Sequence, residues 1–183
     1  TNGAFARFFR PDGARVRNGF FLFDGAYAGG DQIARIDLDD DGARDLLVAR
    51  QNRLSGWRAD GQLLFKLFPY SASYRGELRL AVGDLDGDGK SEIVTTPSEG
   101  ERQPVKVYSR HGELLRGDWY PLGVKYTGGL SVAMGNVRGS AAHELIIGTG
   151  SGAPPEVLVY EPGSAYSWKQ VARWRAFAPH FRG

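Results

Sequence analysis

Two short acidic stretches carry the residues of this sequence that are best suited to chemistry. The first reads DLDDDGARD from Asp37 to Asp45, and the second reads DLDGDGKSE from Asp84 to Glu92. Acids stand at positions 1, 3, 5 and 9 of both stretches, and position 6 is a glycine. Hard oxygen ligands at alternate positions can surround one cation when a glycine permits the sharp turn, and Ca²⁺ takes about six to eight such oxygens. The spacing therefore predicts one Ca²⁺ site in each stretch, about two ions in all.

The predicted ligands are the acids at these four positions and the backbone carbonyl at position 7. They are Asp37, Asp39, Asp41, Ala43 and Asp45 in the first stretch, and Asp84, Asp86, Asp88, Lys90 and Glu92 in the second. An EF-hand is excluded, because its bidentate Glu stands at position 12, where this chain has Val48 and Thr95. The alternative to calcium binding is a pair of solvated acidic turns without metal.

A third stretch, NVRGSAAHE from Asn136 to Glu144, has the same place in the sequence pattern but lacks the aspartates. Asn136, Arg138 and Ser140 stand where the other two stretches have Asp, while the acid at position 9 remains as Glu144. We expect this stretch to be free of metal, with Arg138 supplying a positive charge internally.

The three stretches mark an internal repeat, because their first residues are 47 and 52 positions apart. An apolar run follows each stretch, and an alanine stands three residues before it, at Ala34, Ala81 and Ala133. Each unit continues with a segment that ends in a polar turn and an aromatic-rich segment that closes on aromatic-x-Gly. Four short β segments in a unit of about fifty residues are typical of a propeller blade.

The sequence therefore predicts an all-β protein, a single partial β-propeller whose blades have four antiparallel strands. The predicted units are 1–29, which holds half a blade, and then 30–76, 77–128 and 129–183. About three and a half blades are present, whereas closed propellers have about four to eight. We expect the chain to be part of a larger ring, and the alternative is a half-ring that closes with a second copy.

Composition excludes several classes of function. The net charge of the 183 residues is only +2 and no basic tail is present, so we expect no nucleic-acid partner. The chain has no cysteine, which excludes disulfides, thiolate zinc sites and cysteine nucleophiles. Its apolar runs are too short to span a membrane, and the Arg- and Gly-rich first thirty residues do not resemble a signal peptide.

The sequence contains no recognisable catalytic motif, so we predict that the protein is not an enzyme. The three histidines, His111, His143 and His180, have no metal-binding spacing, and no GxSxG occurs. The glycine-rich GTGSGA at 148–153 is followed by Pro154-Pro155 and an apolar strand, whereas a dinucleotide loop must open a helix.

Aromatic residues fall into two groups by their place in the repeat. Those at repeated positions are expected in the core between blades; they are Trp57 and Tyr108 at one position and Tyr27, Tyr74 and Tyr126 at another. Aromatics outside the repeated positions, namely Trp119, Trp168 and Trp174, are candidates to present a ring to a glycan or a partner.

The segments VGDLDGDGKSEIV, MGNVRGSAAHELIIGTGSG and VLVYEPG resemble the FG-GAP/VCBS-type repeats of integrin α-subunit propellers and of bacterial surface proteins. The resemblance implies a propeller that has seven blades in many members, with Ca²⁺ in the loop between the first two strands of a blade. It also implies an extracellular or cell-surface location and a role in adhesion. We therefore expect a non-catalytic, calcium-stabilised recognition module that binds a protein or a glycan. The alternatives are a structural subunit that contacts neighbouring subunits of a surface layer or filament, and a scaffold part of a polysaccharide-active enzyme.

Overall fold

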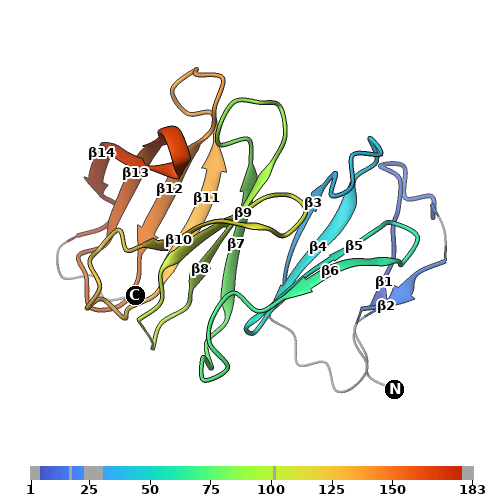
Figure 1. The fold of residues 1–183 in the computed structure, drawn as a ribbon, viewed down its shortest axis with the longest axis horizontal. Helices are drawn as coiled ribbons and strands as arrows, with labels where there is room; N and C mark the ends of the chain where they lie inside the picture. The colour runs from blue at the N-terminus through green and yellow to red at the C-terminus, as the bar shows by residue number, and fades with distance from the viewer. Residues whose placement is uncertain (1–4, 17, 23–30, 101, 179–183) are drawn as a thin grey trace.

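The computed structural model describes residues 5–16, 18–22, 31–100 and 102–178. Within them the chain forms three four-stranded antiparallel sheets and one two-stranded sheet, which follow one another along the molecule (Figure 1). The predicted all-β class and the predicted four-stranded blades are confirmed. Tyr27, His180 and the last residues of the predicted units 1–29 and 129–183 lie outside the described residues.

Each sheet is a meander in which neighbouring strands are consecutive in the sequence. The two-stranded sheet contains β1 (Phe5–Ala6) and β2 (Phe20–Phe21). Blade 1 contains β3 (Gln32–Ile36), β4 (Asp45–Arg50), β5 (Arg53–Trp57) and β6 (Leu63–Leu67). Blade 2 contains β7 (Leu78–Gly83), β8 (Glu92–Pro97), β9 (Val105–Tyr108) and β10 (Leu114–Trp119). Blade 3 contains β11 (Leu130–Gly135), β12 (Glu144–Thr149), β13 (Glu156–Pro162) and β14 (Trp168–Arg175), with the short 3₁₀ turn η1 (Ser164–Tyr166) before β14.

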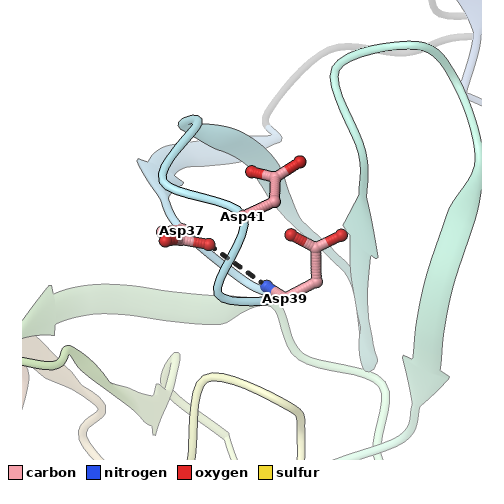
Figure 2. A group of neighbouring side chains, drawn as sticks. All are labelled: Asp37, Asp39 and Asp41. Atoms are coloured by element: carbon pink, nitrogen blue, oxygen red, sulfur yellow. Dashed lines mark hydrogen bonds between the residues drawn. The ribbon is translucent and has the colours of Figure 1, made fainter.

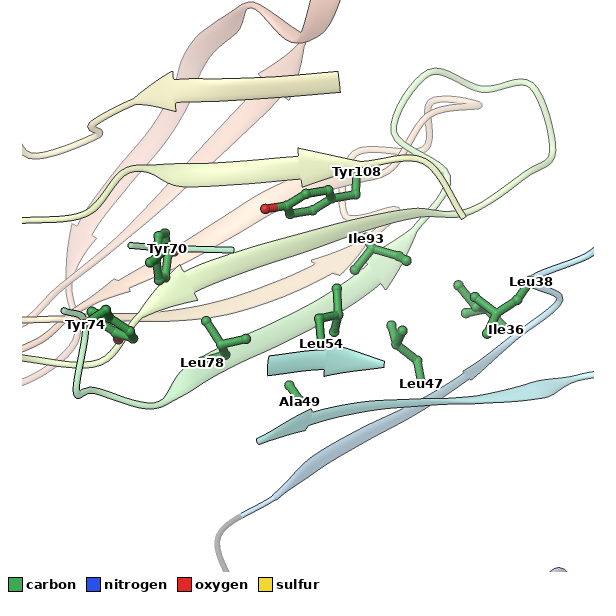
Figure 3. Close-up of a cluster of buried hydrophobic side chains, with 10 residues drawn as sticks. All are labelled: Ile36, Leu38, Leu47, Ala49, Leu54, Tyr70, Tyr74, Leu78, Ile93 and Tyr108. Atoms are coloured by element: carbon green, nitrogen blue, oxygen red, sulfur yellow. The ribbon is translucent and has the colours of Figure 1, made fainter. Parts of the chain in front are cut away.

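The second strand of each blade carries apolar side chains on both faces, and blades 1 and 2 each pack between two neighbouring sheets. In β4, Leu47 belongs to the core shared with blade 2, which includes Ile93 and Tyr108 (Figure 3). The alternate residues Leu46 and Val48 face the opposite side, where the β1–β2 region covers them. This alternation follows from the strand period of two, and it explains why these strands read as continuous apolar runs instead of alternating ones.

Most repeated aromatics lie in the inter-blade core, as predicted. Tyr74 and Tyr108 are buried between blades 1 and 2, and Tyr126 packs against the core between blades 2 and 3. The non-repeated aromatics differ from the expectation in two cases. Trp119 and Trp168 are stacked on each other across blades 2 and 3, with ring centroids 4.7 Å apart, whereas Trp174 is 50% exposed.

The glycine-rich GTGSGA segment closes the hairpin between β12 and β13, and no helix follows it. Here Gly150 donates a backbone hydrogen bond to the carbonyl of Gly129 over 3.1 Å. A Cβ atom at Gly150 would lie 2.1 Å from the Gly128 carbonyl, and one at Gly128 would lie 1.6 Å from the Ser151 carbonyl. The glycines therefore permit close approach of two backbone segments, which is a packing role.

No helix among the described residues has the length and apolar character that spanning a membrane would require.

Candidate metal sites

The three predicted stretches occupy the same place in their blades. Each lies in the hairpin between the first two strands, which we call loop 1 (residues 37–44), loop 2 (84–91) and loop 3 (136–143). The last cross-strand pairs before these loops are Ile36 with Asp45, Gly83 with Glu92 and Gly135 with Glu144. The acid at position 9 therefore opens the second strand in every blade, which places its carboxylate directly beside the loop.

The position-9 carboxylate is tied to its loop by the backbone amide of position 2. Leu38 donates to Asp45 Oδ2 over 3.1 Å, Leu85 to Glu92 Oε2 over 2.7 Å, and Val137 to Glu144 Oε2 over 2.9 Å. This bond recurs in all three blades, including blade 3, whose loop has no aspartate at positions 1, 3 and 5. The bond is therefore a feature of the hairpin itself.

The position-1 aspartate closes loops 1 and 2 by accepting an amide from position 6. Gly42 donates to Asp37 over 3.0 Å, and Gly89 donates to Asp84 over 2.8 Å. Both glycines have left-handed backbones, with φ of 79° and 84°, a conformation that L residues rarely adopt. The glycine at position 6 is therefore needed for the turn that points the acids inward.

Three carboxylates converge in each of the two aspartate-rich loops. In loop 1 they are Asp37, Asp39 and Asp41, drawn in Figure 2, and each offers an oxygen within 4.8 Å of the others. In loop 2 the group is Asp84, Asp86 and Glu92, at the same separation. Each group thus collects hard oxygen donors around one point, an arrangement suited to Ca²⁺.

Two of the eight predicted carboxylate ligands lie outside these groups. Asp45 is fully buried, and its oxygens accept hydrogen bonds from the amides of Leu38 and Ala59. Asp88 accepts from the amide of Lys90 over 2.7 Å. Glu92 joins its group whereas Asp45 does not, which is consistent with the extra methylene of Glu.

The position-7 residues contribute to the loops through their backbone amides. Ala43 donates to Asp41 over 2.8 Å, in the same way that Lys90 donates to Asp88. The carbonyl contribution that we predicted for these two residues stays a prediction.

Two further observations indicate that a cation would fit these groups. Asp39 Oδ1 is buried and accepts no hydrogen bond in the described structure, so one carboxylate oxygen of loop 1 lacks a partner. In loop 2, burial raises the pKa of Glu92 to about 7, and the negative charges of Asp86, Asp88 and Asp84 act in the same direction. A divalent cation would relieve both the unpaired oxygen and this repulsion.

In loop 3 the position-9 acid, Glu144, has hydrogen-bond donors although the loop lacks the aspartates of loops 1 and 2. Burial alone would raise the pKa of Glu144, but hydrogen bonds from the Val137 amide and the Ser140 hydroxyl outweigh it and lower the pKa. The Arg138 guanidinium lies 3.6 Å from Glu161 on β13, so its ion pair is with that residue. The predicted internal charge from Arg138 is therefore replaced by neutral donors within the loop.

Loops 1 and 2 meet different side chains at position 3. Arg58, from the β5–β6 turn of the same blade, donates to Asp39 Oδ2 through Nε at 2.8 Å and also through Nη2. In loop 2, the hydroxyl of Tyr166 from blade 3 donates to Asp86 Oδ2 over 3.3 Å. Loop 1 therefore already contacts a positive charge, whereas the equivalent partner in loop 2 is neutral.

Loop 1 also receives two residues from the β9–β10 turn of blade 2. Arg110 contacts both oxygens of Asp40, at 2.6 and 2.8 Å, and this hydrogen bond lowers the pKa of that carboxyl. His111 places Nδ1 2.9 Å from the Leu38 carbonyl and Nε2 3.4 Å from Asp40. Sequence reasoning missed these partners, together with Arg58 and Tyr166. Their shared signal is position in the turn between the third and fourth strands of a blade.

The sequence and the structure were both compared with known proteins. Residues 37–95, which contain both aspartate-rich loops, match the family model of the FG-GAP-like repeat. The predicted resemblance is confirmed over these residues. Among curated protein sequences, none matches this chain.

Solved structures with the same fold include three rhamnogalacturonan lyases. The exotype lyase YesX gives a TM-score of 0.60 at 14% identity, over 92% of this chain and 35% of its own. Rhamnogalacturonan lyase YesW gives 0.59 at 13% identity, over 96% and 37%. A rhamnogalacturonan lyase of Bacillus licheniformis gives 0.60 at 13% identity, over 96% and 37%. This likeness, together with the four-stranded meanders, confirms the β-propeller class, and this chain spans little more than a third of the length of those proteins.

Proposed function

We propose that this chain is a calcium-stabilised, non-catalytic recognition module that acts outside the cell or at the cell surface and binds a protein or a glycan. The observation that carries the calcium part is the group in loop 2, where Glu92, only 6% exposed, converges with Asp84 and Asp86. A buried carboxylate beside two other acids is costly unless a cation or a proton compensates it.

The chain prepares these acids before any ion binds. Amides of Gly87 and Gly89 hold the two oxygens of Asp84, and the amide of Leu85 holds one oxygen of Glu92. The bound ion would supply positive charge at the point where the carboxylates meet. Because Glu92 opens β8 and Asp84 follows β7, a shared ion would connect the first two strands of blade 2 and stabilise the folded state by mass action.

The recognition part of the proposal is supported by the FG-GAP-like match and by the distribution of reactive groups. Within the described ranges, the only groups of three or more His, Cys, Asp or Glu side chains placed to share an ion are those of loops 1 and 2. These acids hold backbone amides of their own hairpins, which is the expected arrangement for a structural site.

Thermal unfolding and calorimetry test the calcium part. The melting temperature is measured in EGTA and then with added Ca²⁺, and calorimetric titration gives the stoichiometry. We expect a higher melting temperature with Ca²⁺ and about two ions per chain, both lost in the Asp37→Ala/Asp84→Ala double variant. A wild-type protein with no binding and no thermal shift would overturn the calcium assignment and leave the loops as solvated turns.

A second candidate function is the scaffold part of a polysaccharide-active enzyme. It is favoured by the likeness to rhamnogalacturonan lyases, whose chains are much longer than this one. The discriminating experiment incubates the protein with rhamnogalacturonan and Ca²⁺, follows the ultraviolet absorbance of unsaturated products, and measures binding on a glycan array. Turnover would overturn the non-catalytic proposal, whereas binding without turnover would support a glycan-recognition module.

A further inference from the structure

The turn between β13 and β14 differs from the corresponding turns of the other blades. The β5–β6 and β9–β10 turns place a glycine in the left-handed region, Gly61 at φ 99° and Gly112 at φ 86°. In blade 3, Gly163 has φ −114°, and the left-handed residues are Ala165 at 52° and Tyr166 at 53°. Two consecutive L residues with this conformation are disfavoured, so other contacts must hold the turn in place.

Blade 2 supplies those contacts at the base of the turn. Trp168, which opens β14, stacks on Trp119 of β10 at an interplanar angle of 24°. The edge of Tyr160 meets Trp119 as well, with centroids 4.7 Å apart. Arg116 of β10 donates to the carbonyl of Ala165 over 3.5 Å. The turn is therefore anchored on the outer strand of the neighbouring blade.

At the tip of the turn, Tyr166 contacts loop 2. Its hydroxyl donates to Asp86 Oδ2, while the amide of Asp88 donates to Asp86 Oδ1 over 3.2 Å. Both oxygens of this carboxylate are thus oriented, one from its own loop and one from blade 3.

Blade 3 holds a second residue of the same group through its own hairpin. The backbone amide of His143, in loop 3, donates to the carbonyl of Asp84 over 2.6 Å. Contact between loops 2 and 3 is also close at Gly87, where an added Cβ atom would lie 3.5 Å from that of Ala141. Two of the three acids in the loop 2 group therefore contact blade 3 directly.

We propose that Tyr166 is a positioning residue for the cation of loop 2, and that binding of this ion couples blade 2 to blade 3. The inference rests on the calcium part of the proposed function. When the ion fixes Asp86, the hydroxyl of Tyr166 gains a fixed acceptor, and the strained turn is stabilised. Reciprocally, a turn that already holds Asp86 lowers the cost of ordering that ligand, since coupling between two events is mutual.

Removal of one hydroxyl group tests this coupling. Tyr166→Phe is made in an Asp37→Ala background, so that only loop 2 binds Ca²⁺. Affinity is measured by calorimetry, and hydrogen exchange of residues 163–168 is measured with Ca²⁺ and with EGTA. We expect Kd to rise about three- to tenfold, and the Ca²⁺-dependent protection of the turn to decrease sharply. The matched control is Tyr160→Phe, which removes a hydroxyl that donates to Gln170 and is expected to leave both readouts unchanged.

The outcomes separate this inference from the proposal beneath it. If the Asp37→Ala protein binds one ion and Tyr166→Phe changes neither the Kd nor the protection of the turn, the coupling is wrong and the calcium site stands. If the wild-type chain binds no Ca²⁺, the calcium assignment itself is wrong. If Tyr166→Phe lowers the melting temperature equally with Ca²⁺ and with EGTA, its role is structural only and the inference is overturned.

Discussion

Loop 1 and loop 2 have the same acids at the same spacing, but they meet different neighbours. In loop 1 the position-3 acid pairs with Arg58, and the position-9 acid, Asp45, uses both oxygens on backbone amides. In loop 2 the position-3 acid meets the neutral Tyr166, and Glu92 converges with the group. The ligand pattern is the same in both loops, but the neighbouring turn brings a positive charge to loop 1 and a neutral hydroxyl to loop 2. We therefore expect loop 2 to bind Ca²⁺ more tightly than loop 1.

The largest expected effect comes from removing the first acid of each loop in separate variants. Asp84→Ala should eliminate the tighter ion, with a Kd for that site about 1,000-fold higher, or about 4 kcal/mol, whereas Asp37→Ala should eliminate the weaker one. Calorimetric titration of both variants and the wild type measures the two sites. Loss of the tighter ion from Asp37→Ala would reverse the proposed order.

The pH dependence of stability should distinguish the position-9 acids when metal is absent. Glu92 has a folded pKa of about 7 against an ordinary value of 4.5, so the folded state retains a proton that the unfolded chain releases. In EGTA, the free energy of unfolding should therefore fall by about 3 kcal/mol as pH rises from 4.5 to 7. Chemical denaturation across this range measures it. Glu92→Gln should remove most of the decrease and leave the smaller part that comes from Asp45, whose pKa burial also raises.

Glu144 is the control for this prediction, because its pKa is shifted in the opposite direction to that of Glu92. Its folded pKa is lowered, so its contribution is present above the unfolded pKa and is lost as the solution is acidified through the folded pKa. Glu144→Gln should therefore leave the decrease between pH 4.5 and 7 in place. An unchanged decrease in Glu92→Gln would show that another group is responsible.

A smaller effect is expected from neutralising Arg58. In an Asp84→Ala background, where only loop 1 binds, Arg58→Gln should lower the Kd for Ca²⁺ about tenfold, because a competing positive charge leaves Asp39. The affinity is measured by calorimetry at low ionic strength. Lys169→Gln makes the same charge change on β14 in blade 3 and should leave the Kd within about twofold. A higher Kd in Arg58→Gln would mean that the arginine mainly orients Asp39 for the ion.

The smallest effect is expected at position 4 of loop 1. Asp40 lies outside the group that converges and pairs with Arg110 and His111 of blade 2. Asp40→Asn should change the Kd of loop 1 by no more than about twofold, since half-exposed ion pairs contribute little. A loss of binding in this variant would bring Asp40 into the ligand set and would contradict the predicted positions.

The fold and the loops could be predicted from sequence because their signals are local. The spacing of the acids, the glycine at position 6 and the apolar run after position 9 lie within one hairpin, and the repeat shows that hairpin three times. The different roles of Asp45 and Glu92 could not be predicted, because one methylene group decides which atoms each carboxylate reaches. Tyr166 was missed because it lies 80 positions from Asp86 in the sequence. Trp119 and Trp168 were misplaced because their burial depends on the packing of two outer strands.

The glycines that join the β12–β13 hairpin to Gly128 and Gly129 have a consequence for mutational tolerance. Any side chain at Gly128 or Gly150 would overlap a backbone carbonyl, so a substitution scan should show these positions as intolerant as the acids of loop 2. Intolerance to substitution would therefore not distinguish residues that bind an ion from glycines that allow two backbone segments to approach closely. A scan repeated with and without chelator would separate them, because the ligand positions lose the part of their sensitivity that depends on the ion, whereas the glycine positions keep all of theirs.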